Sequence, residues 1–167
     1  GDVTMQVTNY GARVVSLWTP DRAGDYEDIV LGYETIDRYI NNDGERFLGA
    51  VVGPYANRIA KGSFTLDGTE YNLPINNNGQ TLHGGIDGLD RVVWDVVSAS
   101  EDQLVMKYLH ADGQEGFPGN LQIEMTYSLT PENEFRIDYS ATTDKPTVVN
   151  LCLLYTSPSP RDRTTRC

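Results

Sequence analysis

Residues 121–129 read LQIEMTYSL, an unbroken alternation of apolar and polar side chains. Successive side chains of a β-strand point to opposite faces, so this segment has one apolar and one polar face. The apolar face consists of Leu121, Ile123, Met125, Tyr127 and Leu129. After a turn at residues 131–133 the alternation returns in Phe135, Ile137 and Tyr139. The two segments predict neighbouring strands of an antiparallel sheet.

Further hairpins precede this pair. We expect residues 3–7 to pair with 12–18, and residues 92–99 to pair with 104–110. Residues 64–66 and 69–73 flank Asp67-Gly68, a two-residue turn that favours positive φ at both positions. Only residues 35–40 suggest a helical turn. Many short strands at regular spacing predict an all-β fold, an antiparallel β-sandwich.

Composition limits the classes of partner. The chain has 167 residues and a formal net charge of −11, which disfavours nucleic acid and is compatible with an uncharged ligand. No apolar run reaches the roughly 18 residues of a membrane span, and the start lacks a signal-peptide pattern. We expect a cytoplasmic protein with no membrane partner. Because the first residue is Gly1 rather than Met, the natural start is expected to be lost and secretion stays open.

The sequence gives little support for a metal site or for a disulfide within the body of the chain. Cys152 and Cys167 both lie in the last 16 residues, so they cannot link the body of the chain. His83 and His110 are the two histidines, and neither has metal-ligand spacing, so we expect no metal. The loop 112–119 is rich in turn formers and acids. It predicts a solvated turn, with a calcium site as the alternative.

The last 13 residues, YTSPSPRDRTTRC, break every pattern. They contain two prolines and three arginines and no alternating apolar positions. We therefore expect a partial β-sandwich domain over residues 1–154 and a non-native or disordered tail over 155–167. A basic arm that binds an acidic partner is the alternative.

Two short clusters carry the candidate ligand-binding groups. Asn57 and Arg58 lie between Gly53 and Gly62, whose backbone freedom favours sharp turns. An amide with a donor and an acceptor, next to a guanidinium with five donors, suits the hydroxyls of a neutral polyol. The structural alternative is that Arg58 forms a surface ion pair and Asn57 caps a turn.

The second cluster is residues 80–85, QTLHGG. An imidazole with a pKa near 6.5 can donate or accept a hydrogen bond at neutral pH, and the diglycine would let a ligand approach the main chain. The alternative for His83 is a turn residue bonded to backbone. His110, at the end of a strand, is expected to be exposed and structural.

Aromatic side chains add one further possibility. Trp94, Tyr108, Tyr127 and Tyr139 fall within predicted strands, where core packing is expected and a sugar-stacking platform is the alternative. No Walker-type phosphate loop and no nucleophile elbow is present.

Seven motifs in order resemble the aldose 1-epimerase (galactose mutarotase) family. They are NRIAKG at 57–62, FTLDG at 64–68, LPIN at 73–76, LHGG at 82–85, GLD at 88–90 followed by VW at 93–94, DGQEGFPGNL at 112–121, and the segment 141–151. The similarity runs from about residue 3 to residue 151 and corresponds to the N-terminal half of the family.

The resemblance implies a large antiparallel supersandwich, incomplete here, that binds a hexopyranose such as galactose or glucose. In the family, sugar hydroxyls contact the residues that match Asn57, Arg58 and His83. The activity implied is interconversion of α and β anomers without a cofactor, by an acid at the ring oxygen and a base at the O1 proton.

The chain departs from the family after Val149-Asn150-Leu151. The family continues there with a Thr-Asn-His-Ser-like segment that supplies the acid, and much later with a glutamate that supplies the base. Neither is in this sequence, so the catalytic residues of the chain are unknown and we expect it to be inactive alone. The alternative function is a non-catalytic carbohydrate-binding β-sandwich.

The preferred sugar and the oligomeric state stay open. An incomplete sandwich is expected to leave unpaired strand edges and an uncovered apolar face on residues 121–129 and 135–139. Such a chain would aggregate or stay molten.

Overall fold

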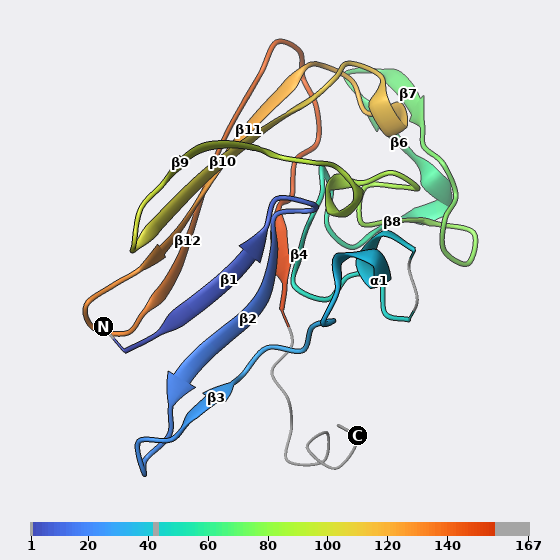
Figure 1. The fold of residues 1–167 in the computed structure, drawn as a ribbon. Coiled ribbons are helices and arrows are strands. Elements are labelled where there is room, and N and C mark those ends of the chain that lie inside the picture. The colour runs from blue at the N-terminus through green and yellow to red at the C-terminus, as the bar shows by residue number, and fades with distance from the viewer. Residues whose placement is uncertain (1, 42–43, 156–167) are drawn as a thin grey trace.

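Two antiparallel sheets face each other in a computed structural model that describes residues 2–41 and 44–155 (Figure 1). The first sheet has the strand order β1-β2-β3. Its strands are β1 (Thr4–Thr8), β2 (Arg13–Pro20) and β3 (Tyr26–Asp28). β1 and β2 form the first predicted hairpin, with a register shift between Gln6 and Val7.

The second sheet has the order β12-β11-β10-β9. Its strands are β9 (Asp95–Ala99), β10 (Gln103–His110), β11 (Leu121–Leu129) and β12 (Phe135–Thr143). Every residue of β11 pairs with β12, from Leu121↔Thr143 to Leu129↔Phe135. The predicted antiparallel pairing of these two segments and the predicted antiparallel all-β fold class are therefore confirmed.

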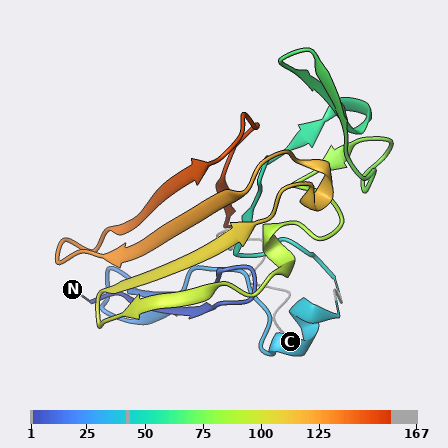
Figure 2. The same cartoon turned by 90° about the horizontal axis from the view of Figure 1, so that it is seen from above.

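The core lies between these sheets. Residues of β2, β10 and β11 form one buried cluster, and side chains of β1 pack against it. The hydroxyl of Tyr127 on β11 donates to the carbonyl oxygen of Ala12, just before β2, at 2.8 Å. Viewed from above, the strands β1 and β2 lie alongside β9 and β10 (Figure 2).

The predicted uncovered apolar face is wrong for β11. Leu121, Ile123, Met125 and Tyr127 are between 0% and 3% exposed, because β1 and β2 cover them. Phe135, Ile137 and Tyr139 of β12 are half-buried and pack against the same cluster. The two sheets thus enclose a core between them.

The predicted unpaired edges are present. β9 and β12 are the outer strands of the four-stranded sheet and have no second strand partner among the described residues. Val96 and Val97 on β9 are 52% and 51% exposed. Edge strands of this kind template further pairing, so the expected aggregation stays a prediction.

Short elements join the sheets. They are α1 (Ile36–Ile40), β4 (Ala50–Val52), β5 (Arg58–Ile59), η1 (Ala60–Gly62), β6 (Ser63–Leu66), β7 (Thr69–Asn72), β8 (Thr81–Leu82), η2 (Leu89–Arg91), η3 (Gln114–Gly116) and β13 (Cys152–Leu154). The β6–β7 hairpin turns at Asp67 and Gly68 with φ of 50° and 79°, as predicted, and projects from the end remote from the N-terminus (Figure 2).

The end of the domain is tied into the fold by β13. Cys152 pairs with Val52 and Leu154 with Ala50, so residues 152–154 continue the sandwich rather than the tail. Tyr155 is described and exposed. The remainder of the predicted tail, residues 156–167, lies outside the described residues.

His110 is buried, and the expectation of an exposed side chain is wrong. It is 1% exposed because β10 continues through it, and the two-residue period places it on the same face as Met106. The loop after β10 then folds Phe117 over the ring, with centroids 6.0 Å apart. Both ring nitrogens lack a hydrogen-bond partner among the described residues.

The predicted core role of the strand aromatics is confirmed for two of them. Trp94 and Tyr127 are fully buried, and Tyr108 and Tyr139 are half-buried against the core cluster. Within residues 2–41 and 44–155, no helix is long and apolar enough to span a bilayer.

Candidate functional site

The pairing of β5 with β8 brings the two predicted clusters together. Arg58 pairs with Leu82, so Asn57 before β5 lies opposite His83 after β8. The His83 N–H donates to the Asn57 carbonyl oxygen at 3.0 Å. Both residues have positive φ, 70° for Asn57 and 53° for His83, so each strand turns sharply at this point.

The imidazole is oriented by a second bond between the same residues. The backbone N–H of Asn57 donates to Nδ1 of His83 at 2.9 Å. Since Nδ1 accepts, the neutral ring carries its proton on Nε2, which has no partner among the described residues. Nδ1 is therefore bonded to backbone, as the alternative for His83 states. Nε2 is left to act as a donor.

Electrostatics favour this neutral form. Burial lowers the pKa of His83 below its ordinary value of 6.5. The charge of Asp90 opposes that shift, whereas the guanidiniums of Arg58 and Arg46 add to it. At neutral pH the ring is thus an uncharged N–H donor.

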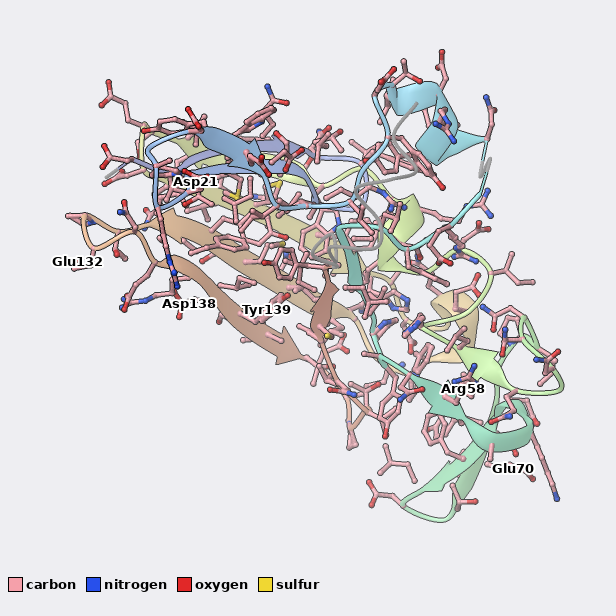
Figure 3. The ribbon with its side chains drawn as sticks, turned by 90° about the horizontal axis from the view of Figure 1, so that it is seen from below. Asp21, Arg58, Glu70, Glu132, Asp138 and Tyr139 are labelled. Atoms are coloured by element: carbon pink, nitrogen blue, oxygen red, sulfur yellow. The ribbon has the colours of Figure 1, made fainter. Side chains whose placement is uncertain are left out.

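Arg58 is held by amides rather than by a carboxylate. Its Nη1 donates to Oδ1 of Asn57 at 3.5 Å and its Nη2 to Oδ1 of Asn77 at 3.2 Å. Arg58 forms no ion pair with any of the described residues, so the structure does not bear out the surface ion-pair alternative there. The side chain lies in the part of the molecule built by the short strands, away from the two main sheets (Figure 3). The residue is exposed.

Gly84 and Gly85, which follow His83, pack against other parts of the protein. They do not leave the main chain open to a ligand, contrary to the expectation from the sequence. A Cβ on Gly84 would lie 1.8 Å from the carbonyl oxygen of Gly53, and one on Gly85 would lie 2.1 Å from Oε2 of Glu115. The space beside each glycine is therefore filled by the protein. This contact locks the turn of His83 onto the segment that leads to Asn57.

A hollow of about 420 Å³ opens beside the imidazole. Its described lining consists of Glu45, Phe47, Leu48, Asn77, Leu82, His83, Leu154 and Tyr155. His83 lines it directly, while Asn57 and Arg58 do not; Arg58 reaches its margin through Asn77. A volume of this size is within the range of small-molecule sites.

Phe47 and Asn77 were missed by the sequence analysis. Asn77 stands in the run Asn76-Asn77-Asn78, whose excess of amides is a usable signal. Phe47 has no local signal, because its position depends on contacts with distant residues. Its ring meets the His83 ring edge to face, with centroids 4.7 Å apart.

A buried ion network holds Phe47 in place. Asp90 is fully buried and accepts from Nε and Nη2 of Arg46 at 2.7 and 3.0 Å. Arg13, 1% exposed, donates to the carbonyl oxygens of Arg46 and Leu48 at 2.9 and 3.0 Å. The segment 46–48 is thus fixed at its backbone and at one side chain.

The loop 112–119 is stabilised from within the protein. Asp112 accepts from the N–H of Gly119 at 2.6 Å and pairs with Lys145. These contacts are those of the predicted turn. Among the described residues no group of three or more His, Cys, Asp or Glu side chains is placed to hold a metal.

The chemistry of the site is that of hydroxyl recognition. A neutral imidazole donor, a guanidinium and two side-chain amides lie within one network, and among residues 2–41 and 44–155 none of them is paired with an acid. Such groups bind neutral oxygens without a large desolvation cost for the ligand.

These features define the class of the protein as an antiparallel β-sandwich with a hollow beside its short strands, lined by both polar and apolar side chains. The chain belongs to the aldose 1-epimerase family, whose sequence pattern matches residues 1–153. The match extends two residues beyond the limit expected from the motifs, in agreement with the pairing of β13.

Curated relatives are similar over most of the chain. It is 39% identical to galactose mutarotase of Rattus norvegicus over 149 residues, which cover 89% of the chain and 42% of the relative. It is 36% identical to aldose 1-epimerase of Escherichia coli K12 with the same coverage, 89% and 42%. The chain therefore spans less than half the length of these relatives.

Solved structures agree. A GalM/aldose epimerase homologue from C. elegans has a TM-score of 0.89 at 30% identity, covering 95% of the chain and 48% of that structure. Galactose 1-epimerase from Lactobacillus acidophilus has a TM-score of 0.78 at 28% identity, covering 92% of the chain and 45% of that structure.

Proposed function

We propose that this chain is the sugar-recognition part of an aldose 1-epimerase, binding a hexopyranose such as galactose or glucose at the His83 hollow. The observation that carries the proposal is the orientation of His83, whose Nδ1 is occupied by the Asn57 N–H so that Nε2–H is free to donate. Asn57 and Arg58 are proposed to bind further hydroxyls, and His83 lines the hollow directly. The names of the rat and E. coli relatives support this ligand class.

Anomer interconversion would follow from proton transfer at two oxygens. A base takes the O1 proton, an acid protonates the ring oxygen, the aldehyde rotates about C1–C2, and the ring closes on the other face. In this chain His83 Nε2–H can donate a hydrogen bond to a sugar oxygen, and Arg58 can stabilise developing negative charge. Positioned acid and base groups each supply on the order of 10²–10⁴ in rate.

We propose that the 167-residue polypeptide alone binds sugar without accelerating mutarotation. Among the described residues that line the hollow, Glu45 is the one carboxylate, and its Oε1 accepts weakly from the Phe47 N–H at 3.4 Å. It is exposed to solvent, unlike a base enclosed for proton transfer. The alternative, a non-catalytic carbohydrate-binding β-sandwich, makes the same prediction for this polypeptide.

Polarimetry with freshly dissolved α-D-galactose and α-D-glucose tests the activity. The polypeptide should leave the rate of optical rotation change at its spontaneous value, while nuclear magnetic resonance (NMR) titration shows binding of both sugars. Acceleration that is lost in His83→Ala and in Glu45→Gln would show that the chain has its own proton relay and would overturn the inactivity. Absence of sugar binding would overturn the recognition function.

A further inference from the structure

The hollow has an aromatic wall that none of the proposed hydroxyl contacts uses. Phe47 is half-buried and lines the hollow next to His83. The aromatic candidates taken from the strands, such as Trp94 and Tyr127, lie in the core instead. Phe47 lines the hollow and also forms a ring contact with the candidate sugar-binding imidazole.

Two neighbouring side chains contact the ring. The Arg46 guanidinium lies 4.8 Å from its centroid, and the His83 ring meets it at an interplanar angle of 69°. Arg46 is in turn fixed by Asp90 and by a bond of 2.9 Å from its Nη2 to the carbonyl oxygen of Ile86. A side chain fixed in this way loses little conformational entropy when a ligand packs against it.

A hexopyranose, the ligand class proposed above, has an apolar face that can pack against an aromatic ring such as Phe47. A hexopyranose carries hydroxyls around its rim and C–H groups on its faces. In the galacto configuration the axial O4 leaves the C–H groups at C3, C4 and C5 on one face, which forms a larger apolar patch than in the gluco configuration. Aromatic rings bury apolar area efficiently and with defined geometry.

We propose that Phe47 is a sugar-contacting, specificity-determining residue, whose ring packs against the C–H face of a hexopyranose while His83 and Arg58 bind its hydroxyls. The inference rests on the proposed function, since it needs a sugar in the hollow. It adds that the galacto configuration gains more from Phe47 than the gluco configuration does.

The test uses methyl β-D-galactopyranoside and methyl β-D-glucopyranoside, which cannot mutarotate, so binding is measured apart from turnover. The sugar C–H resonances are followed by proton NMR as the protein is added. In the unmodified protein, the galactoside H3, H4 and H5 signals should shift upfield from the ring current of Phe47. Phe47→Leu should abolish that shift, weaken galactoside binding at least fivefold and bring the galactoside-to-glucoside affinity ratio towards one.

Phe64→Leu is the matched control, because Phe64 stacks on Tyr71 at 5.3 Å in the β6–β7 hairpin and does not line the hollow. It should leave the shift and both affinities unchanged. Phe47→Tyr keeps the ring and should retain the upfield shift and affinity within twofold. If Phe47→Leu fails to fold, nuclear Overhauser effects between the Phe47 ring and the sugar in the unmodified protein decide the question.

The outcomes separate the two proposals. Galactoside binding that Phe47→Leu leaves within twofold, but that His83→Ala weakens, would overturn the role of Phe47 and leave the proposed function standing. No binding of either glycoside by the unmodified protein would overturn the proposed function and this inference with it.

Discussion

The imidazole Nδ1 of His83 accepts a 2.9 Å hydrogen bond from the backbone N–H of Asn57, a residue 26 positions earlier in the chain. This bond sets the tautomer of the ring and joins the two turns that carry the candidate ligand-binding groups. The antiparallel pairing of Arg58 with Leu82 makes it possible. The local fold, rather than the individual residues, thus prepares the recognition geometry.

We expect His83→Ala to weaken hexose binding about fivefold, because one hydrogen bond to a ligand contributes about 1 kcal/mol. Isothermal titration calorimetry with D-galactose measures the change.

Arg58→Lys should also weaken binding, since an ammonium lacks the fork that reaches both Asn57 and Asn77. The control Arg136→Lys changes an exposed arginine on β12 that pairs with Glu134. An equal loss in this control would contradict the assignment.

Asp90→Ala should destabilise the protein by about 3–5 kcal/mol, because it leaves Arg13 and Arg46 with uncompensated charge in a buried place. Urea unfolding measures the change in the free energy of unfolding. Asp87→Ala is the matched control, since Asp87 is 68% exposed and pairs with Arg91 at 3.9 Å. Its cost should stay below about 1 kcal/mol. Similar costs for the two variants would refute the buried network as the support of the Phe47 segment.

Gly84→Ala should destabilise the fold by about 2–5 kcal/mol, through strain at positive φ and overlap with backbone. The added Cβ would meet the Gly53 carbonyl oxygen at 1.8 Å, at a φ of 89°. Gly79→Ala provides the comparison, because its φ is 77° but nothing lies within 4 Å of the added Cβ. Thermal unfolding of both variants separates overlap from φ strain. Equal melting temperatures would show that the Gly84 contact is not tight.

Acid should destabilise the protein through His110. Burial lowers the pKa of His110 from 6.5 to about 4, so the unfolded chain takes up a proton more readily than the folded one. The stability that this neutral ring contributes is complete above pH 6.5 and is lost as the pH falls towards 4. The slope approaches about 1.4 kcal/mol per pH unit between those values.

The measurement is urea unfolding at intervals from about pH 7.5, above the ordinary pKa of histidine, down to about pH 4, the lowered pKa of His110. His110→Leu should remove most of the slope, because both ring nitrogens are unpartnered and leucine leaves no unsatisfied group. The pKa of His83 is also lowered, so the double variant with His83→Gln serves to separate the two contributions. An unchanged slope in His110→Leu would refute the assignment.

The long strands follow from local pattern. β11 begins at Leu121 and ends at Leu129, as the alternation of apolar residues predicts, and α1 begins one residue after the predicted start. By contrast β4 consists of three fully buried residues and shows no alternation. β5 and β8 have two residues each and exist only through their mutual pairing. Such elements depend on distant contacts, which a local pattern does not contain.

In the candidate site, too, some residues are indicated by local sequence and others depend on distant contacts. Asn57, Arg58 and His83 were identified from residue type and neighbouring glycines, and the fold brings them together. Their role in sugar binding stays a prediction. The sequence did not indicate Phe47, because its position depends on the Asp90–Arg46 contact, which spans 44 positions. The sequence did not predict the burial of His110, because that burial depends on how the following loop folds Phe117 against the ring.

The most direct test of sugar recognition is a titration of the ¹⁵N-labelled protein with D-galactose, followed by amide chemical shifts. Sugar bound at the hollow should shift the amides of Asn57, Arg58 and His83 most, and at the same sugar concentration His83→Ala should reduce those shifts, because it weakens binding. The competing place is the groove of about 290 Å³ at the opposite end of the sandwich, which includes Met5, Leu104 and Leu129 in its lining. Unchanged amides at the three site residues, or the largest shifts in that groove, would contradict the account.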